Sequence, residues 1–424
     1  MSKINTFFRS TIWAIIFCGS VALFTPSAFA LTLTQFRDCV GPNTGSYGYT
    51  CTLDAGTHLI SSTIDISRNP GGGNTLLVQG TITTALGDTT LKRSSLGTNA
   101  IMQRTSSGGQ VTIANFRFDG DRDTTDTCKT SNFPDDLELA SSTGPTLVYY
   151  NEFIDAPGIA INSGAYSSFQ YLSIKRARVF GIRLGTNNTY YSNYYEHTGT
   201  NAVVLDAGAY MADDYFYSNH DEFVFEHSGG QLWIAGIEAV GSGGGITVIN
   251  GIFDGQNATA TQGDAHAGSY GCPVPGTDSQ ILGNLGIEAY NTADMGDVHL
   301  ISNSIWGHYW QGVLFRTLAT GAHTQANGNI DITTYCGGAC SAQLIASSAH
   351  SHGIDIQGNT TGSVTFAGVM SQWNNGYGIS LAGSGYTATF SGNACLSNNG
   401  SGRVSAAGGV TVSGLPGSDT CPTH

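Results

Sequence analysis

The sequence predicts an all-β chain wound into a right-handed parallel β-helix, and three observations lead to this prediction. A small residue followed by a β-branched residue recurs about every twenty-two residues. Each such pair opens a short run of alternating apolar residues, as in Val203/Leu205 and Val313/Phe315. The 58 glycines among 424 residues supply frequent tight turns. Alternate residues of a strand share a face, so stacked repeats would bury a continuous apolar column.

The repeat can be followed through nine landmarks. Their spacing stays close to this period, apart from two intervals of nearly twice the length that stand for two coils or for one coil with a long loop. The period is too short for a propeller blade, and hairpin signals and a leucine-rich consensus are missing. The general preference of parallel connections sets a right hand. The landmarks are Gly158-Ile159, Gly181-Ile182, Ala202-Val203, Phe223-Val224, Gly245-Ile246, Gly286-Ile287, Gly312-Val313, Gly353-Ile354 and Gly378-Ile379.

The N-terminus, residues 1–30, has the pattern of a signal peptide. Lys3 and Arg9 precede an apolar run of fourteen residues, and residues 27–30 (SAFA) end in the small-residue pattern of a cleavage site. The run is too short to span a bilayer, and no later stretch is long or apolar enough to do so. We therefore expect a secreted protein (extracellular, periplasmic or cell-surface) without a membrane span. A retained N-terminal anchor is the alternative.

The mature chain is expected to form a cap, a solenoid and a second cap. Residues 31–50 would cover the first coil, because an open coil exposes unpaired strand edges. Coils are expected over residues 51–394, with inserted loops near 254–280 and 318–342. Residues 395–424 are rich in glycine and serine and are expected to close the far end.

Eight cysteines remain after the signal peptide, and an even number in an exported chain indicates disulfides. Pairing between sequence neighbours is the economical hypothesis, although the sequence does not prove connectivity. A zinc site is the rival interpretation, but no CxxC pair or histidine cluster supports it. The expected pairs are Cys39–Cys51, Cys336–Cys340 and Cys395–Cys421, which leaves Cys128 with Cys272.

The net charge argues against a nucleic-acid partner. It is −14 for the whole chain and falls to −16 once the two cations of residues 1–30 are removed. So acidic a chain lacks the electrostatic footprint for nucleic acid or an anionic membrane surface. Only 11% of the residues are charged, so the chain is not a disordered acidic polymer either.

Three segments resemble the pectate-lyase-like superfamily of right-handed β-helix proteins. Residues 53–58 (LDAGTH) are similar to the "LPAGTY" strand of these proteins, and residues 111–122 (VTIANFRFDGDR) to their "vtisnltiDGnr" strand and turn. The glycine–isoleucine coils complete the likeness, which covers about residues 50–400. The superfamily includes lyases, hydrolases and epimerases of polysaccharides, tailspikes and adhesins, so the resemblance implies a polysaccharide partner.

Sharper signatures of that superfamily are missing. In place of the hydrolase motifs the chain offers Asp213-Asp214 and Ser351-His352-Gly353, more than a hundred residues apart. The Trp-Ile-Asp-His and Arg-x-Pro-x-x-Arg motifs of pectate lyases are absent. The resemblance therefore specifies fold far better than activity.

A ladder of mixed charge in the middle coils is the candidate site. Outward residues in the same slot of adjacent coils should line up, and the slots before the landmark strands carry acidic, then basic, then acidic and aromatic residues. Such a set could neutralise a uronate carboxylate, remove the adjacent proton and protonate the leaving oxygen. The candidate catalytic residues are Lys175, Arg178, Glu196, His197, Tyr217 and His220, and the candidate substrate-binding residues are Glu152, Arg176 and Asp221.

Alternatives remain for this ladder. A hydrolase would use two carboxylates, such as Glu196 and Asp221, at a set separation. A non-catalytic rod would leave Glu152, Lys175 and Glu196 as an exposed salt-bridge ladder that solvates an outer face. Tyrosines 190, 191, 194, 195, 210, 215 and 217 would stack in the core if inward and on sugar rings if outward.

Alternating carboxylates at Asp119, Asp121 and Asp123 form a possible Ca²⁺ site. The segment departs from a calcium-binding helix–loop–helix, with Thr124 in the place of the invariant glycine. A turn with solvated carboxylates is the alternative. No other cofactor is predicted.

The sequence thus predicts a polysaccharide lyase or glycoside hydrolase acting on a glycan that contains uronic acid. The alternative is a non-catalytic carbohydrate-binding or adhesin-like surface protein. The glycan and the oligomeric state do not follow from the sequence.

Overall fold

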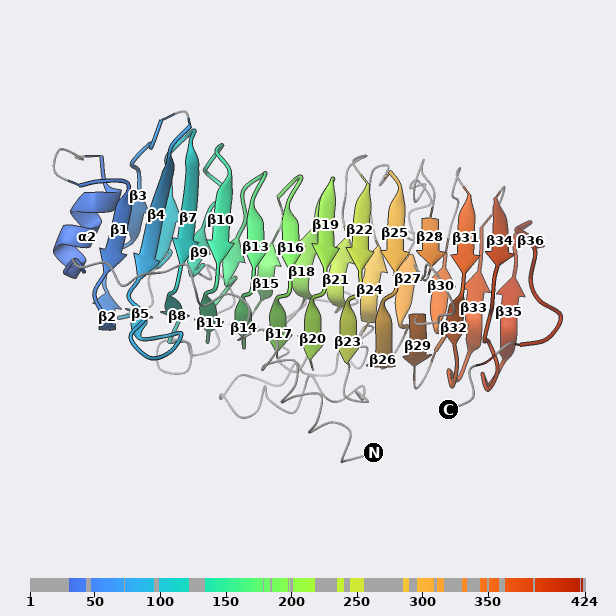
Figure 1. Ribbon diagram of the computed structural model, residues 1–424. Helices are drawn as coiled ribbons and strands as arrows, with labels where there is room; N and C mark the ends of the chain where they lie inside the picture. Colours follow the sequence, from blue (N-terminus) through green and yellow to red (C-terminus); the bar gives the residue numbers. More distant parts are fainter. Residues whose placement is uncertain are drawn as a thin grey trace, which may run out of the picture.

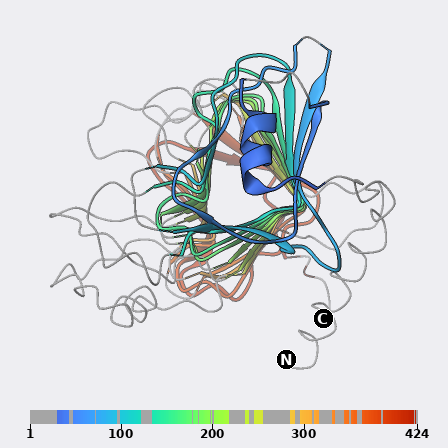
Figure 2. The same cartoon turned by 90° about the vertical axis from the view of Figure 1, so that its left-hand side faces the viewer.

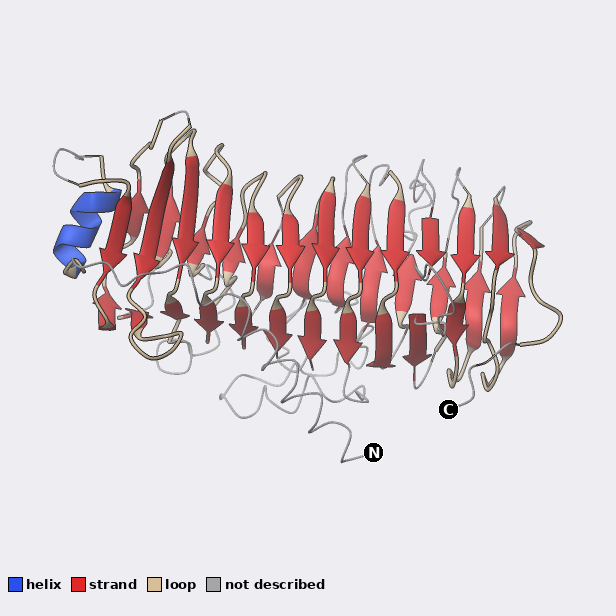
Figure 3. Cartoon of the chain, viewed as in Figure 1, coloured by secondary structure: helices blue, strands red, loops and turns tan. Residues whose placement is uncertain are grey.

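A computed structural model of the chain contains one helix and a long stack of short parallel strands (Figure 1). It describes residues 30–42, 47–71, 73–94, 99–121, 134–177, 179–183, 185–196, 198, 201–217, 235–239, 245–254, 285–289, 296–308, 311–315, 330–333, 344–348, 351–357, 363–383, 386–419 and 421. The strands form three sheets, which we call A, B and C, and the chain visits them in that order in each coil up to β33; the last coils have no sheet B strand. Figure 3 shows the three sheets running along the length of the molecule.

The bounds of the elements are as follows. Sheet A contains β1 (Thr50–Leu53), β4 (Thr75–Gly80), β7 (Gln110–Ala114), β10 (Thr146–Tyr149), β13 (Ser168–Gln170), β16 (Thr189–Tyr191), β19 (Ala209–Ala212), β22 (Ile246–Ile249), β25 (Val298–Ile301), β28 (Ile330–Thr333), β31 (Val364–Ala367), β34 (Thr387–Ser391) and β36 (Thr411–Ser413). Sheet B contains β2 (Gly56–Ile60), β5 (Thr89–Arg93), β8 (Arg117–Asp119), β11 (Glu152–Ile154), β14 (Ser173–Lys175), β17 (Tyr194–Glu196), β20 (Tyr215–Tyr217), β23 (Ile252–Asp254), β26 (Ser304–His308), β29 (Leu344–Ser348) and β32 (Val369–Ser371). Sheet C contains β3 (Ile64–Ile66), β6 (Met102–Arg104), β9 (Leu137–Glu138), β12 (Ile161–Asn162), β15 (Phe180–Arg183), β18 (Asn201–Leu205), β21 (Ala235–Ala239), β24 (Leu285–Ala289), β27 (Val313–Phe315), β30 (Ile354–Ile356), β33 (Tyr377–Leu381) and β35 (Gly402–Ala406). The remaining element is α2 (Leu33–Val40).

The predicted fold is confirmed: the chain is a right-handed parallel β-helix with a cap at its start and a disulfide near its end. Every strand pairs in parallel with its equivalent in the next coil, as in Val148↔Phe169 and Phe169↔Tyr190 in sheet A. In the middle of the solenoid one coil takes twenty-one residues, the separation of Leu172 from Asn193 and of Asn193 from Asp214. The coil there is slightly shorter than the average repeat.

Two landmarks of the repeat were assigned to the wrong position. Ile161, and not Ile159, pairs with Ile182 in sheet C. Ile246 belongs to sheet A, where it pairs with Ala209, while the sheet C partner of Val203 is Ile237. The first of the two long intervals, which begins at Ile246, therefore runs from sheet A to sheet C and is not a whole number of coils.

The second long interval is one coil with a long connection, because Val313 in β27 pairs directly with Ile354 in β30. The alternating apolar residues at these landmarks do point inward. Val203 and Leu205 are fully buried, and so is Val313. Inward residues of successive coils stack into columns, such as Tyr195 on Phe216, whose ring centroids are 4.7 Å apart.

From β7 to β25, the corner between sheets A and B is a tight turn built from one residue with a positive φ after each sheet A strand. The next residue is in several coils a buried asparagine whose side chain bonds to the backbone of the coil below. Asn193 illustrates the geometry: its Oδ1 accepts from the backbone N–H of Leu172 (2.9 Å), and its Nδ2 donates to the carbonyl of Phe169 (3.1 Å). Asn151 and Asn303 make equivalent bonds, which satisfy backbone groups that the turn would otherwise bury unpaired.

The first coil is covered by helix α2, which the sequence prediction did not include. Thr32 begins the helix with a capping box to Gln35. Phe36 and Val40 are fully buried against the first coils, and Figure 2 shows the helix lying over the open end of the solenoid. The Cys39–Cys51 disulfide, as predicted, fastens the helix to β1.

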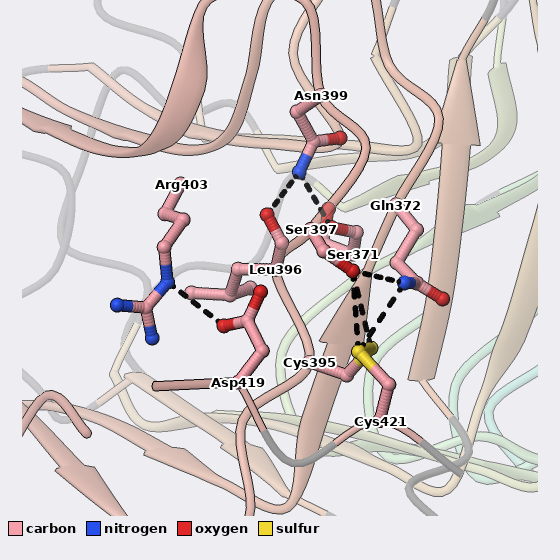
Figure 4. The surroundings of a disulfide bond; sticks show 9 residues. All are labelled: Ser371, Gln372, Cys395, Leu396, Ser397, Asn399, Arg403, Asp419 and Cys421. Carbon is pink, nitrogen blue, oxygen red and sulfur yellow. Dashed lines mark hydrogen bonds and ion pairs between the residues drawn. A yellow bond between two sulfur atoms is a disulfide. The ribbon is translucent and has the colours of Figure 1, made fainter. Parts of the chain in front are cut away.

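The last coils are fastened by the second predicted disulfide, Cys395–Cys421 (Figure 4). Cys395 makes an isolated parallel bridge to Met370, so this segment covers the end of sheet B after β32. Arg403 and Asp419 add an ion pair of 2.8 Å that also holds the C-terminal segment. The other predicted pairs, of Cys128, Cys272, Cys336 and Cys340, lie outside the described residues, as do residues 1–29. In the described part of the chain no helix is long and apolar enough to cross a bilayer.

Candidate functional site

The outer face of sheet B brings together three of the predicted site residues. Lys175, Glu196 and Tyr217 end the consecutive strands β14, β17 and β20, and they pair in register with one another. Inward neighbours of the same strands, such as Tyr195, are buried, so the row of Lys175, Glu196 and Tyr217 faces outward. We call this row together with Tyr194 and Tyr215 the sheet B site.

Tyrosine rings form the middle of the sheet B site. Tyr194 and Tyr215 stack with centroids 5.5 Å apart, and Tyr215 lies 6.3 Å from Tyr217. Lys175 Nζ lies 5.9 Å from the centroid of the Tyr194 ring, which is a cation–π distance. The site thus combines an aromatic surface with a cation at one end.

The Tyr194 hydroxyl is a hydrogen-bond donor and not a base. Burial raises its pKa well above the usual value, and the hydrogen bond to the Glu196 carboxylate raises the pKa further. Removing the proton from this hydroxyl would place a second negative charge beside Glu196. Lys175 and Tyr217 are therefore the better base candidates in the row.

Glu152 is the acidic neighbour of Lys175 in the preceding coil, but it is held mainly by another residue. Arg117 Nε donates to Glu152 Oε2 at 2.6 Å, whereas Lys175 Nζ is 3.8 Å from Oε1. The carboxylate of Glu152 is thereby neutralised without Lys175. About a third of the Lys175 side chain is exposed (34%), so its ammonium group can meet a ligand.

Arg176 is occupied by a different partner. It has a positive φ of 56°, and its guanidinium donates to Asp155 Oδ2 at 2.5 Å. This pair connects two coils at the turn that follows sheet B. Its geometry favours a structural role for Arg176 over a role as substrate clamp.

The predicted calcium ligands Asp119 and Asp121 meet at one cation, and that cation is a lysine. Lys92 Nζ lies 2.8 Å from Asp121 Oδ1 and 3.5 Å from Asp119 Oδ2. Asp119 Oδ1 also accepts the backbone N–H of Asp121, which is an Asx turn. No cluster of three or more possible metal ligands occurs among the described residues, and Asp123 lies outside them.

Four further predicted residues lie outside the described residues: Arg178, His197, His220 and Asp221. Their roles stay predictions.

Sequence reasoning missed a carboxyl cluster beside sheet C. Asp135 and Glu138 are hydrogen-bonded to each other, and burial together with this contact raises the pKa of Asp135 to about 7. Glu138 Oε2 also accepts from Asn162 Nδ2 at 2.7 Å. Asp136 is fully buried and paired with Arg93 at 3.1 Å, and its burial raises its pKa to about 7. The sequence signal that could have indicated this cluster is the Pro134-Asp135-Asp136 run, which comes directly before a strand of alternating apolar residues.

This cluster does not have the geometry of a glycosidase. The two carboxyl groups of such enzymes stand about 5 to 9 Å apart, with room for sugar or water between them. Asp135 and Glu138 instead interact directly, and Glu138 is also held by Asn162. The Asp213-Asp214 pair also fails as a hydrolase motif, because Asp214 is fully buried at the corner between sheets A and B. The His352 ring is occupied as well, since its Nδ1 accepts from the backbone N–H of Tyr377 (2.9 Å).

Several solved structures are similar to this chain over most of its length. The chain is similar to the A-module of the mannuronan C-5 epimerase AlgE4 from Azotobacter vinelandii, with 10% identity, TM-score 0.40 and coverage of 92% of this chain and 95% of that one. It is similar to the pectate lyase Pel9A, with 13% identity, TM-score 0.39 and coverage of 87% and 72%. It is also similar to the catalytic domain of a GH87 α-1,3-glucanase in complex with nigerose, with 13% identity, TM-score 0.41 and coverage of 93% and 70%. No protein-family model matches the chain, and no curated protein matches it significantly.

Proposed function

We propose that this protein is an exported carbohydrate-active β-helix that binds a uronic-acid-containing polysaccharide at the sheet B site and cleaves it by elimination. The observation that carries the proposal is the tyrosine stack with Lys175 at its end. Pyranose rings present apolar faces that suit Tyr194 and Tyr215. The Lys175 ammonium, with Glu152 already held by Arg117, suits the carboxylate of a uronate.

The elimination has defined requirements. A base removes the proton on the carbon next to the carboxylate, and the electron pair of that C–H bond forms a carbon–carbon double bond. The glycosidic C–O bond then breaks, and the leaving oxygen takes a proton. A cation beside the carboxylate stabilises the negative charge that develops during proton removal. Lys175 and Tyr217 are the two groups of the row that can supply the cation and the base.

Lys175→Gln tests this proposal. Residues 31–424 would be incubated with polygalacturonate and with alginate, with and without Ca²⁺, and the ultraviolet absorbance of unsaturated uronate followed. We expect absorbance to grow with the parent protein, and Lys175→Gln to slow it by roughly 10²-fold or more. The matched control is Lys92→Gln, which removes a lysine in the same row of sheet B whose ammonium is held by two carboxylates.

The other outcomes assign the alternatives. New reducing ends without absorbance would replace elimination by hydrolysis. Retention on the acidic glycans without any cleavage, if weakened by Lys175→Gln, would leave a binding protein that uses the same site. Equal effects of Lys92→Gln and Lys175→Gln would contradict the placement of the site.

A further inference from the structure

Sheet A carries a second group of outward tyrosines that the proposed function does not use. Tyr149 ends β10, Tyr191 ends β16, and Tyr210 lies in β19, while Tyr150 and Tyr171 occupy the corner that follows β10 and β13. We call these five residues the tyrosine platform. In Figure 1 the strands β10, β13, β16 and β19 stand side by side in one sheet.

The platform rings form two contacting groups on the outside of the solenoid, Tyr149 with Tyr150 and Tyr171, and Tyr191 with Tyr210. The centroid of Tyr149 lies 5.6 Å from that of Tyr171 in an edge-to-face contact and 6.2 Å from that of Tyr150. Tyr191 and Tyr210 lie 5.7 Å apart, and their hydroxyls are hydrogen-bonded. More than a third of Tyr191 (36%) is exposed, whereas its inward neighbour Tyr190 is fully buried.

Tyr150 and Tyr171 occupy a backbone conformation that is unfavourable for a bulky side chain. Both have left-handed backbones, with φ of 52° and 54°. A bulky residue is disfavoured in this conformation, which asparagine, aspartate and glycine tolerate better. The same corner carries a small or polar residue in the other described coils, namely Asn115, Ser192, Asp213, Asn250, Ser302, Gly368, Gly392 and Gly414.

The surroundings of the platform are polar but nearly uncharged. Among the described residues of the outward rows and corner from β10 to β19, only Asp213 carries a charge. Gln170, Ser168 and Thr189 lie between the rings and supply hydroxyl and amide groups. This combination suits a ligand with apolar ring faces and many hydroxyls, and it offers nothing to bind a carboxylate, a phosphate or a peptide charge.

We propose that the tyrosine platform binds the neutral sugar residues of a polysaccharide by ring stacking, separately from the sheet B site. The platform lies around the corner from that site, since Tyr191 precedes Tyr194 by three residues in one coil. Tyr149 and Tyr191 lie in one row two coils apart, with Gln170 between them, so a glycan chain running along the solenoid axis would meet these rings about 10 Å apart. The proposal does not depend on cleavage at sheet B.

Affinity electrophoresis of residues 31–424 tests the proposal, with galactomannan, hydroxyethylcellulose or soluble starch cast into the gel. We expect retardation by at least one of these neutral glycans, and roughly tenfold weaker binding for each platform ring removed in Tyr149→Ala and Tyr191→Ala. Tyr166→Ala is the matched control, because Tyr166 has the same left-handed backbone (φ of 57°) and is 62% exposed, but lies at the other end of a sheet A strand. Neutral stacking should also persist in high salt, which screens contacts between exposed charges.

Tyr150→Asn and Tyr171→Asn keep the test independent of folding. Asparagine suits the left-handed backbone, so these variants should unfold at a higher temperature than the parent while binding the neutral glycan more weakly. Unchanged retardation in them and in Tyr149→Ala would overturn the platform. Light scattering gives a second outcome that would overturn the proposal. If the parent protein is a dimer and Tyr191→Ala is a monomer, the platform joins two copies of the chain. Loss of acidic-glycan binding in Lys175→Gln with neutral binding intact would leave both proposals standing.

Discussion

Asp214 occupies a position that asparagine fills in other coils at the corner between sheets A and B. Its Oδ1 accepts the backbone N–H of Asn193 at 2.6 Å, as an asparagine oxygen would. Its Oδ2 has no hydrogen-bond partner among the described residues. In Asn193 the equivalent atom is the amide nitrogen, which donates to a backbone carbonyl. Burial raises the pKa of Asp214 well above its usual value, although the hydrogen bonds from Asn193 oppose this shift.

Asp214→Asn should stabilise the protein at neutral pH. A raised folded-state pKa gives a contribution that is fully present below the unfolded value near 4 and is lost as the pH rises. The substitution should therefore add about 1–3 kcal/mol to the free energy of unfolding at pH 8, and less towards pH 4. Chemical denaturation at several pH values measures it.

Asp213→Asn is the matched control for this position, since Asp213 is exposed at the adjacent residue and should change stability little. An equal gain from Asp214→Asn at pH 4 and pH 8 would show that Asp214 is ionised in the fold. The converse change, Asn193→Asp, should destabilise the protein most at high pH.

The sequence predicted which residues line up in the site better than it predicted which charged residues form ion pairs. Lys175, Glu196 and Tyr217 were predicted to line up because regular coils of constant length separate them. The partners of Lys92 and Glu152, by contrast, come from coils joined by longer connections, and they are Asp121 and Arg117. A single change in connection length alters which charges meet, and no local pattern records it.

At the scale of the strands, sheet B contributes an aromatic column to the core. Phe216 in β20 lies between Tyr195 and Phe253, with centroid distances of 4.7 and 4.5 Å and nearly parallel rings. Each ring covers the face of the next, so the column joins three coils. Removing the middle ring leaves a cavity that the rigid coils cannot close.

Phe216→Ala should cost about 3–5 kcal/mol of unfolding free energy. Tyr215→Ala changes the neighbouring residue, whose side chain lies on the outer face, and should cost much less while weakening glycan binding. Denaturation and glycan retention measured on both variants would separate the two faces of one strand. Similar stability losses in both would contradict the inward and outward assignment.

The sequence predicted correctly which strand positions pair between coils of constant length. It predicted these pairings wrongly where the coil length varies. Ile182 and Val203 were placed correctly relative to each other, because one coil separates them. Gly245-Ile246 was misassigned because sheets A and C both open strands with a small residue before a β-branched one. Helix α2 was missed because eight residues with a cap give a weak periodic signal.

For the whole molecule, the covers at the ends of the solenoid protect its terminal strands. Helix α2 covers the first coil, and the segment closed by Cys395–Cys421 covers the last strand of sheet B. Without such covers the terminal strands would present unpaired N–H and C=O groups to other molecules. The middle coils need no such protection, since each pairs on both sides.

Cys395→Ser with Cys421→Ser should therefore loosen the C-terminal end. A disulfide across 26 residues stabilises by about 3.5 kcal/mol through loop entropy, so the thermal midpoint should fall. Light scattering should show association at temperatures where the parent protein remains clear. Scattering unchanged from that of the parent would mean that the Arg403–Asp419 contact alone holds the segment.

The constant length of the coils between β10 and β20 has a mechanical consequence. Tension applied to the two ends of the chain would peel coils off one at a time, because each is held only by its neighbours. A released coil of this length extends to at most about 70 Å. The middle of the molecule would thus yield in equal steps, whereas longer steps would mark the coils that carry long connections.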